Sequence, residues 1–299
     1  MKYSLVRAIA AGIRVALSGA VAAGFLGAQG CRPAGPPIST ALTQLEPGIL
    51  FKEVQLNDAD HTKIQVYLPV TATKEKPVPC IFIAPAGTPL FVGNALGKAD
   101  HPEHLPYARA GFAVIAYEIS GDLAEGATNS QARDAIREFR AADAGIYNAS
   151  AAIDYAIKAL PMIDPAHLAV AGHSSAATLA LIVAEHDPRI KACIAYAPCT
   201  DVPGRLEKHM PMLEQLSPGI EDFLRAHSPN TGADKLHCRL FLFHSEEDAN
   251  VPISQSADFA AEVRRTNPDV TFVRAPTGDH YHSMIDQGIP AAIQWLKGK

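Results

Sequence analysis

Six short, almost uninterrupted apolar runs constrain the fold of this chain more than any other feature. They read CIFIAP, FAVIAYEI, LAVAG, IKACIAYAP, RLFLFH and VTFVRAP. Strands that are covered on both faces have this pattern, which is typical of parallel sheets. Helical patterns separate them, namely ASAAIDYAIKAL, SAATLALIVAEH, ISQSADFAAEVRRT and IPAAIQWLKG. Strands that alternate with helices predict an α/β fold with one mostly parallel sheet and helices on both faces.

Two earlier segments and one later segment complete this outline. ILFKEVQL and KIQVYLPV alternate apolar with polar residues. They predict a hairpin at the sheet edge, which brings the sheet to about eight strands. Residues 201–235 contain prolines and short helical patches but no strand signal. We expect them to form a small cap over the carboxyl edge of the sheet, where open α/β sheets bind ligands; a plain surface excursion is the alternative.

The first residues have the anatomy of an export signal. Basic residues precede an uncharged run over residues 15–30. The run is shorter than the roughly 20 apolar residues of a spanning helix, so it predicts a secretory signal over residues 1–30. The letters AQGC at its end resemble a bacterial lipoprotein cleavage site in which Cys31 is lipidated, which implies a periplasmic or membrane-anchored protein. A proline-rich tether over 31–47 then precedes one catalytic domain over 48–299.

Composition and short motifs exclude several classes of function. The formal net charge is -5, which argues against a general affinity for nucleic acid. No G-x-G-x-x-G follows an early strand, so we expect no dinucleotide cofactor. His101 and His104 flank Pro102, which argues against a regular helix that presents both imidazoles to a metal, and no HExxH motif exists. We expect no metal. The partner we expect is a small-molecule ester, and the oligomeric state is left open.

The cysteines give no sign of a metal site or a redox motif. No paired CxxC spacing occurs. Three of the cysteines lie in or just before strongly apolar runs, namely Cys80, Cys193 and Cys238. We expect these three to be buried free thiols that pack as small hydrophobic side chains.

The stretch AGHSSAA places a serine where a strand turns directly into a helix. Strand and helix nearly touch at such a turn, so the residues two before and two after the apex must be small. Gly172 and Ala176 satisfy this condition around Ser174. Around Ser175 the preceding flank would be His173, which is too large. Ser174 is therefore the predicted apex and nucleophile, and we expect Ser174→Ala to abolish activity and Ser175→Ala to leave most of it.

This turn resembles the nucleophile elbow of the α/β-hydrolase superfamily, G-x-S-x-G, with alanine for the last glycine. In that superfamily the acid and the histidine follow the serine along the chain. The segment RLFLFHSEEDANVP resembles the acid loop of the dienelactone hydrolase and prolyl oligopeptidase branches, where an aspartate stands three residues before V-P. The resemblance implies Asp248 as the acid. Glu246 and Glu247 are nearby alternatives, and as solvated loop acids they fit less well.

The last strand leads into TGDHYHSMI, which matches the position of the superfamily's histidine loop. A glycine just before the catalytic histidine and an aromatic residue after it favour His280 over His282. The resemblance also implies an oxyanion hole made by the backbone N–H of Ser175 and by an N–H between Ala86 and Thr88, with Gly87 as the assigned donor.

A serine, an aspartate and a histidine in this order imply a serine hydrolase with an acyl-enzyme intermediate. Related oligopeptidases have a large amino-terminal domain, for which there is no room between Cys31 and the first strand. We therefore expect an esterase or lactone hydrolase for small molecules. A prolyl-oligopeptidase-like peptidase is the first alternative, and a non-catalytic binding protein on the same scaffold is the second.

Overall fold

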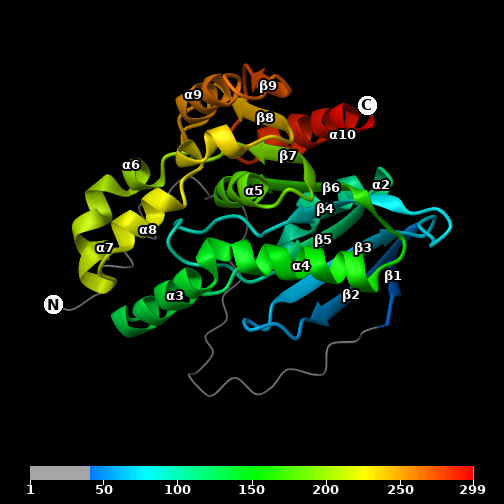
Figure 1. The fold of residues 1–299 in the computed structure, drawn as a ribbon, viewed down its shortest axis with the longest axis horizontal. Helices are drawn as coiled ribbons and strands as arrows, with labels where there is room; N and C mark the ends of the chain where they lie inside the picture. Colours follow the sequence, from blue (N-terminus) through cyan, green and yellow to red (C-terminus); the bar gives the residue numbers. More distant parts are fainter. Residues whose placement is uncertain (1–40, 299) are drawn as a thin grey trace.

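A computed structural model describes residues 41–298 of the chain. Its centre is a nine-stranded sheet in the order β1-β2-β3-β5-β4-β6-β7-β8-β9 (Figure 1). The pairs that join β1, β2, β3 and β5 are antiparallel, and the pairs from β5 to β9 are parallel. The strands are β1 Thr43–Glu46, β2 Ile49–Gln55, β3 Lys63–Pro69, β4 Val78–Ile83, β5 Ala113–Tyr117, β6 Ile163–His173, β7 Ile190–Tyr196, β8 Arg239–Ser245 and β9 Val270–Ala275.

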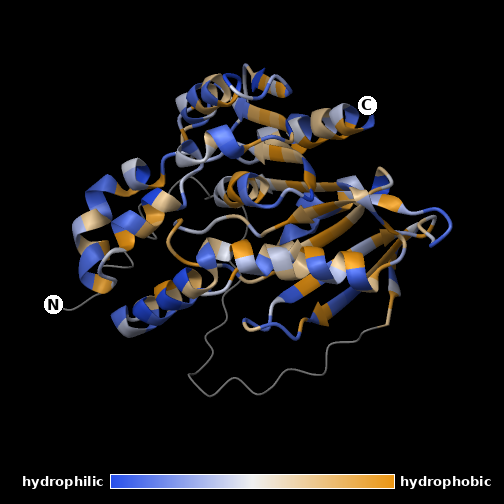
Figure 2. Ribbon diagram, in the orientation of Figure 1, coloured by the Kyte–Doolittle hydropathy of each residue, from blue (hydrophilic) through white to orange (hydrophobic). Residues whose placement is uncertain are grey.

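Helices cover both faces of this sheet, as the continuous apolar runs predict. One hydrophobic cluster lies between the sheet and helices α4, α5 and α9, and a second lies between the other face and helices α2 and α10. Figure 2 shows the hydrophobic residues gathered on the central strands. The helices are α2 His101–Arg109, α3 Asn129–Ala141, α4 Ile146–Ala159, α5 Ser175–His186, α6 Val202–Leu206, α7 Met210–Leu216, α8 Ile220–Ala226, α9 Ser254–Val263 and α10 Ile289–Lys297.

Two elements differ from the expectations. β1 pairs with β2 and lies within the segment 31–47, which the sequence assigns to the tether. Its four residues, TQLE, are mostly exposed, so no apolar pattern in the sequence predicts this strand. It is a strand because of its hydrogen bonds to β2. The expectation against a helix at His101 and His104 is wrong, because α2 includes both. Pro102 lies in its first turn, where a missing N–H leaves no helical hydrogen bond unmade.

The segment 201–235 forms helices and no strand, and it packs against the sheet's helical layer. α6, α7 and α8 contact one another, and α7 also contacts α3. A third hydrophobic cluster joins them to residues 91–92 of the loop after β4 and to α3, through side chains such as Leu206 and Ile136. In Figure 1 the three helices lie together beside α3, at one end of the molecule. This segment is the small cap insertion of the predicted fold.

The export signal of residues 1–30, Cys31 and most of the tether lie outside the described residues. Between residues 41 and 298, no helix is both long enough and apolar enough to span a membrane. The four cysteines of this part are free: Cys80, Cys193 and Cys199 are buried, and Cys238 is half-buried.

Candidate active site

Ser174 occupies a sharp turn between β6 and α5. Its backbone has φ 55° and ψ -120°, a region that residues other than glycine rarely adopt and that costs roughly 1–3 kcal/mol. The turn also requires a glycine two residues earlier, because a Cβ on Gly172 would lie 2.3 Å from the backbone oxygen of Ala176. Strand and helix therefore meet as closely as the spacing predicts, and a strained serine stands at the apex.

Asp248 and His280 come together at the carboxyl edge of the sheet. The His280 Nδ1 lies 2.6 Å from the Asp248 Oδ2. The other carboxylate oxygen accepts hydrogen bonds from the backbone N–H groups of Asn250 and Val251, at 2.8 and 2.9 Å. Both side chains are buried, with exposed fractions of 1% for Asp248 and 6% for His280. The loops after β8 and β9 thus hold an oriented carboxylate–imidazole pair.

A second histidine contacts the same carboxylate. The Nε2 of His244 lies 2.9 Å from the backbone oxygen of Val251 and 3.1 Å from the Asp248 Oδ2. A carbonyl can only accept, so this nitrogen carries a proton and donates. Burial by itself would raise the pKa of Asp248, but hydrogen bonds from His244 and His280 outweigh it and hold that pKa well below its usual range. Asp248 is therefore a carboxylate at neutral pH.

His173, the residue before Ser174, joins the elbow to His280. Its Nε2 donates to the backbone oxygen of His280 at 2.8 Å, and the two ring centroids lie 4.5 Å apart. Burial lowers the pKa of His173 to about 3, so the ring is neutral and its single proton serves this bond. Because the Nδ1 of His280 faces Asp248, its Nε2 is the nitrogen left for chemistry. That atom is buried and has no hydrogen-bond partner among residues 41–298.

The alternative acids and the alternative base lie elsewhere. His282 pairs with Asp279 at 2.7 Å, and its side chain is 65% exposed. Glu246 pairs with the exposed Arg274, and Glu247 accepts the backbone N–H of Gly278. None of these three side chains contacts the Asp248–His280 pair by a hydrogen bond or ion pair within the described part of the chain.

The loop after β4 lies against α5, with one difference from the expected arrangement. The backbone N–H groups of Gly87 and Thr88 both donate to the hydroxyl oxygen of Ser175, at 3.0 and 3.1 Å. The amide assigned to Gly87 as an oxyanion donor is thus already engaged by a side chain. Asn94 steadies the same loop by donating to the backbone oxygen of Ala86 at 2.6 Å.

Sequence reasoning misses three side chains of this site: His244, His173 in its bonding role, and the hydroxyl of Ser175. A local signal exists only for His244, which lies on the same strand-to-loop segment as Asp248, four residues before it. Nothing near His173 or Ser175 in the sequence indicates which distant backbone groups they bind.

A small cavity adjoins the Ser175 side chain beneath the cap. It has a volume of about 30 Å³. Its lining is mostly apolar and combines the loop after β4, α5 and the insertion, through Thr88, Leu90, Ser175, Leu179, Val202 and Leu224 among others. The insertion therefore borders the site from the side of α5.

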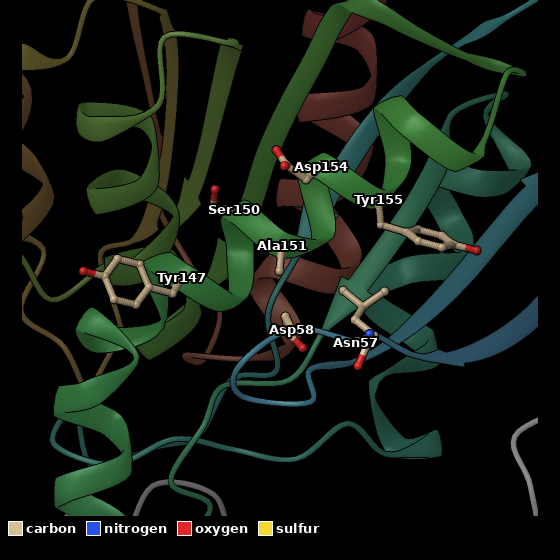
Figure 3. A pocket seen from close by; sticks show the side chains of 8 residues that line it. Asn57, Asp58, Tyr147, Ser150, Ala151, Asp154 and Tyr155 are labelled. Atoms are coloured by element: carbon tan, nitrogen blue, oxygen red, sulfur yellow. The ribbon is translucent and has the colours of Figure 1, made fainter.

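A wider surface groove of about 400 Å³ lies along α4. Figure 3 shows Tyr147, Ser150 and Asp154 on that helix, with Asp58 from the loop after β2 beside it. None of the predicted triad residues lines this groove. Among residues 41–298, no group of three or more histidine, cysteine or acidic side chains could hold a metal ion.

Comparison with solved structures places the fold among esterases and peptidases. An esterase of Pyrococcus furiosus, Pf2001, has a TM-score of 0.60 at 15% identity, over 88% of this chain and 99% of its own. Acetyl xylan esterase 1 from a Thermoanaerobacterium species has a TM-score of 0.64 at 15% identity, over 88% of each chain. A puromycin-hydrolyzing peptidase of Mycobacterium tuberculosis has a TM-score of 0.66 at 19% identity, over 83% of this chain but 40% of its own.

These TM-scores show a shared fold. A search of curated proteins gave no match. The model of the prolyl oligopeptidase family matches residues 101–296, which is more than half of the chain and includes the elbow and the loops that hold Asp248 and His280. The chain therefore belongs to the prolyl oligopeptidase family and, with it, to the serine hydrolases of the α/β-hydrolase superfamily.

Proposed function

We propose that this protein cleaves carboxylic esters or lactones of small molecules through Ser174, His280 and Asp248. One observation carries the proposal. Asp248 binds the imidazole of His280, and the backbone oxygen of His280 accepts a hydrogen bond from His173, the residue before the strained serine. His173 thus links the residue that carries the base to the residue before the predicted nucleophile. Proton transfer also requires the Ser174 oxygen to come within hydrogen-bond reach of the His280 Nε2, a bond that is not formed among the described residues.

The chemistry follows from these positions. The Ser174 oxygen attacks the ester carbonyl carbon while the His280 Nε2 takes its proton. The tetrahedral oxyanion then collapses, the bond to the leaving oxygen breaks, and His280 returns the proton to the alcohol. Water attacks the acyl-enzyme in the same way and releases the acid and free Ser174. Asp248 stabilises the imidazolium and fixes its tautomer throughout.

The choice of an ester substrate is supported by the share of each similar protein that is matched. The two esterases are matched over 88% or more of their own length, and the peptidase over 40%. The cavity beside Ser175 has only about 30 Å³, and we propose that it receives the acyl group, which favours short acyl chains. A peptidase that acts on short peptides remains the second candidate, since several peptidases share the fold.

The test is reaction with a fluorophosphonate probe, followed by peptide mapping and by turnover of aryl acetate and of aminoacyl amides. We expect the label on Ser174. Ser174→Ala should lose turnover by roughly 10⁶-fold, and His280→Ala should be about as damaging.

His282→Ala is the matched control, because its imidazole is exposed and bonded to Asp279; we expect near wild-type turnover. Labelling of another residue would refute Ser174 as the nucleophile. An inactive His282→Ala enzyme together with an active His280→Ala enzyme would refute His280 as the base. Faster turnover of the amides than of the acetate would favour the peptidase.

A further inference from the structure

The residue after the predicted nucleophile has an unusual set of hydrogen bonds. The hydroxyl oxygen of Ser175 accepts the N–H of Gly87 at 3.0 Å and the N–H of Thr88 at 3.1 Å. Ser175 is buried, with 7% of its surface exposed, and it is the first residue of α5. Its own backbone N–H therefore lies in the first turn of the helix, where amides have no acceptor within the helix.

The hydrogen-bonding capacity of a hydroxyl group determines which further hydrogen bonds Ser175 can form. A serine oxygen has two lone pairs that accept and one proton that it can donate. Gly87 and Thr88 fill both lone pairs. Within residues 41–298 no acceptor lies within hydrogen-bond distance of the Ser175 hydroxyl as a donor. The proton of the Ser175 hydroxyl is therefore available to a group outside the described residues, such as a bound substrate.

We propose that the Ser175 hydroxyl is a side-chain donor of the oxyanion hole, beside the backbone N–H of the same residue. This inference rests on the proposed ester hydrolysis at Ser174. The two loop amides act on the oxyanion through the hydroxyl: each N–H that the oxygen accepts draws electron density from it and makes its O–H a stronger donor. The proton stays on Ser175 throughout, and no bond to it is broken.

This arrangement explains how the Gly87 amide can be engaged and the site still stabilise negative charge. An amide that already donates to a side chain has no second proton for a substrate oxygen. In the proposal Ser175 donates in place of the engaged loop amides. Its N–H and its O–H both belong to the residue that directly follows Ser174. In this proposal the substrate oxyanion that forms when Ser174 attacks the carbonyl carbon accepts from both donors of Ser175.

The test compares the wild type with the Ser175→Ala variant. Both are assayed with one aryl acetate and with a trifluoromethyl ketone, to which the nucleophilic serine adds to form a charged tetrahedral adduct. Removal of one oxyanion donor costs roughly 10²- to 10³-fold in kcat. We expect a kcat loss in that range with KM changed by less than about threefold, since the bond strengthens with the charge. The trifluoromethyl ketone should bind more weakly by about the same factor, and Ser175→Thr should recover most of the lost kcat.

Thr62→Val is the control for loss of a buried hydroxyl. Thr62 is fully buried and its hydroxyl bonds to Asp58 and Asn148, outside the site; its variant should lose thermal stability and keep kcat. A Ser175→Ala enzyme with wild-type or higher kcat would overturn the proposal, since the hydroxyl would then be a bystander or an obstruction. A kcat loss without weaker ketone binding, or a Ser175→Thr enzyme as slow as Ser175→Ala, would overturn it too.

Fluorophosphonate labelling of the same variants distinguishes a failure of this proposal from a failure of the proposed ester hydrolysis at Ser174. If Ser174 is labelled in Ser175→Ala and turnover is unchanged, the role of the hydroxyl is wrong and the serine hydrolase assignment stands. If Ser174 is unlabelled even in the wild type, the proposed function itself fails.

Discussion

Ser174 is held in a strained conformation that its neighbours enforce. Its φ is 55°, and strand and helix approach so closely around it that a Cβ on Gly172 would clash with the backbone of Ala176. Such strain persists when the surrounding structure over-determines it, and it concentrates at functional sites. The carboxylate of Asp248 is also fixed in position, because two histidines and two backbone amides contact it in a buried site.

This environment predicts how Asp248→Asn behaves with pH. At neutral pH the substitution removes the charge that fixes the tautomer of His280, so kcat should fall by roughly 10⁴-fold. The folded-state pKa of Asp248 is lowered and lies below its unfolded value of about 3.9. The carboxylate therefore stabilises the fold fully above that value, and its contribution is lost as the pH falls toward the lower folded-state pKa.

Thermal unfolding between pH 7 and pH 2 is the measurement. The difference in Tm between wild type and Asp248→Asn should be largest near neutrality and should shrink as the pH falls below about 4. A difference that stays constant down to pH 2 would contradict this account of Asp248.

At the scale of elements, the insertion between β7 and β8 shapes the cavity next to Ser175. Val202 of α6 and Leu224 of α8 form part of its wall, opposite Leu179 of α5. All three side chains are buried. If the cavity receives the acyl group, as proposed above, these side chains of the insertion set how long that group can be.

Leu224→Ala should lengthen the acyl chain that the enzyme accepts. One methylene in an apolar pocket changes kcat/KM by roughly 10- to 200-fold. Removal of the leucine side chain should therefore raise the ratio of hexanoate to acetate kcat/KM by about tenfold or more. Turnover of aryl esters of graded acyl length is the measurement.

Leu213→Ala is the matched control for this substitution. Leu213 is fully buried in the same insertion, on α7, and does not line the cavity. Both variants should lose roughly 2–5 kcal/mol of stability, but only Leu224→Ala should change the acyl preference. An equal change in both, or in neither, would show that the cavity does not hold the acyl group.

For the whole molecule, the export signal of residues 1–30 and lipidation at Cys31 stay predictions. Intact-mass measurement of the protein from its own cells should find a chain that begins at Cys31 with the added mass of lipid. A chain beginning at Met1 would refute export, and an unmodified Cys31 would refute the anchor. Removal of residues 1–31 should leave a soluble, active enzyme, because the first strand begins only at Thr43.

The strand–helix alternation and the sharp turn at Ser174 could be predicted from the amino-acid sequence. Both depend on residues that are close along the chain, such as the apolar runs and the Gly172–Ala176 spacing. Asp248 and His280 are predicted from the resemblance of their loops to the acid and histidine loops of the α/β-hydrolase superfamily. Other features depend on contacts between distant segments. β1 forms because β2 offers it backbone hydrogen-bond partners, and α2 forms despite its prolines.

The same limit applies to the hydroxyl of Ser175. From the sequence it has only a backbone role, and Ser175→Ala is expected to leave most of the activity. In the fold its oxygen binds amides that lie 88 and 87 positions earlier in the chain. No local pattern encodes such a contact, because a hydrogen bond depends on where two distant backbones meet, and the packing of the whole sheet and its helices fixes that.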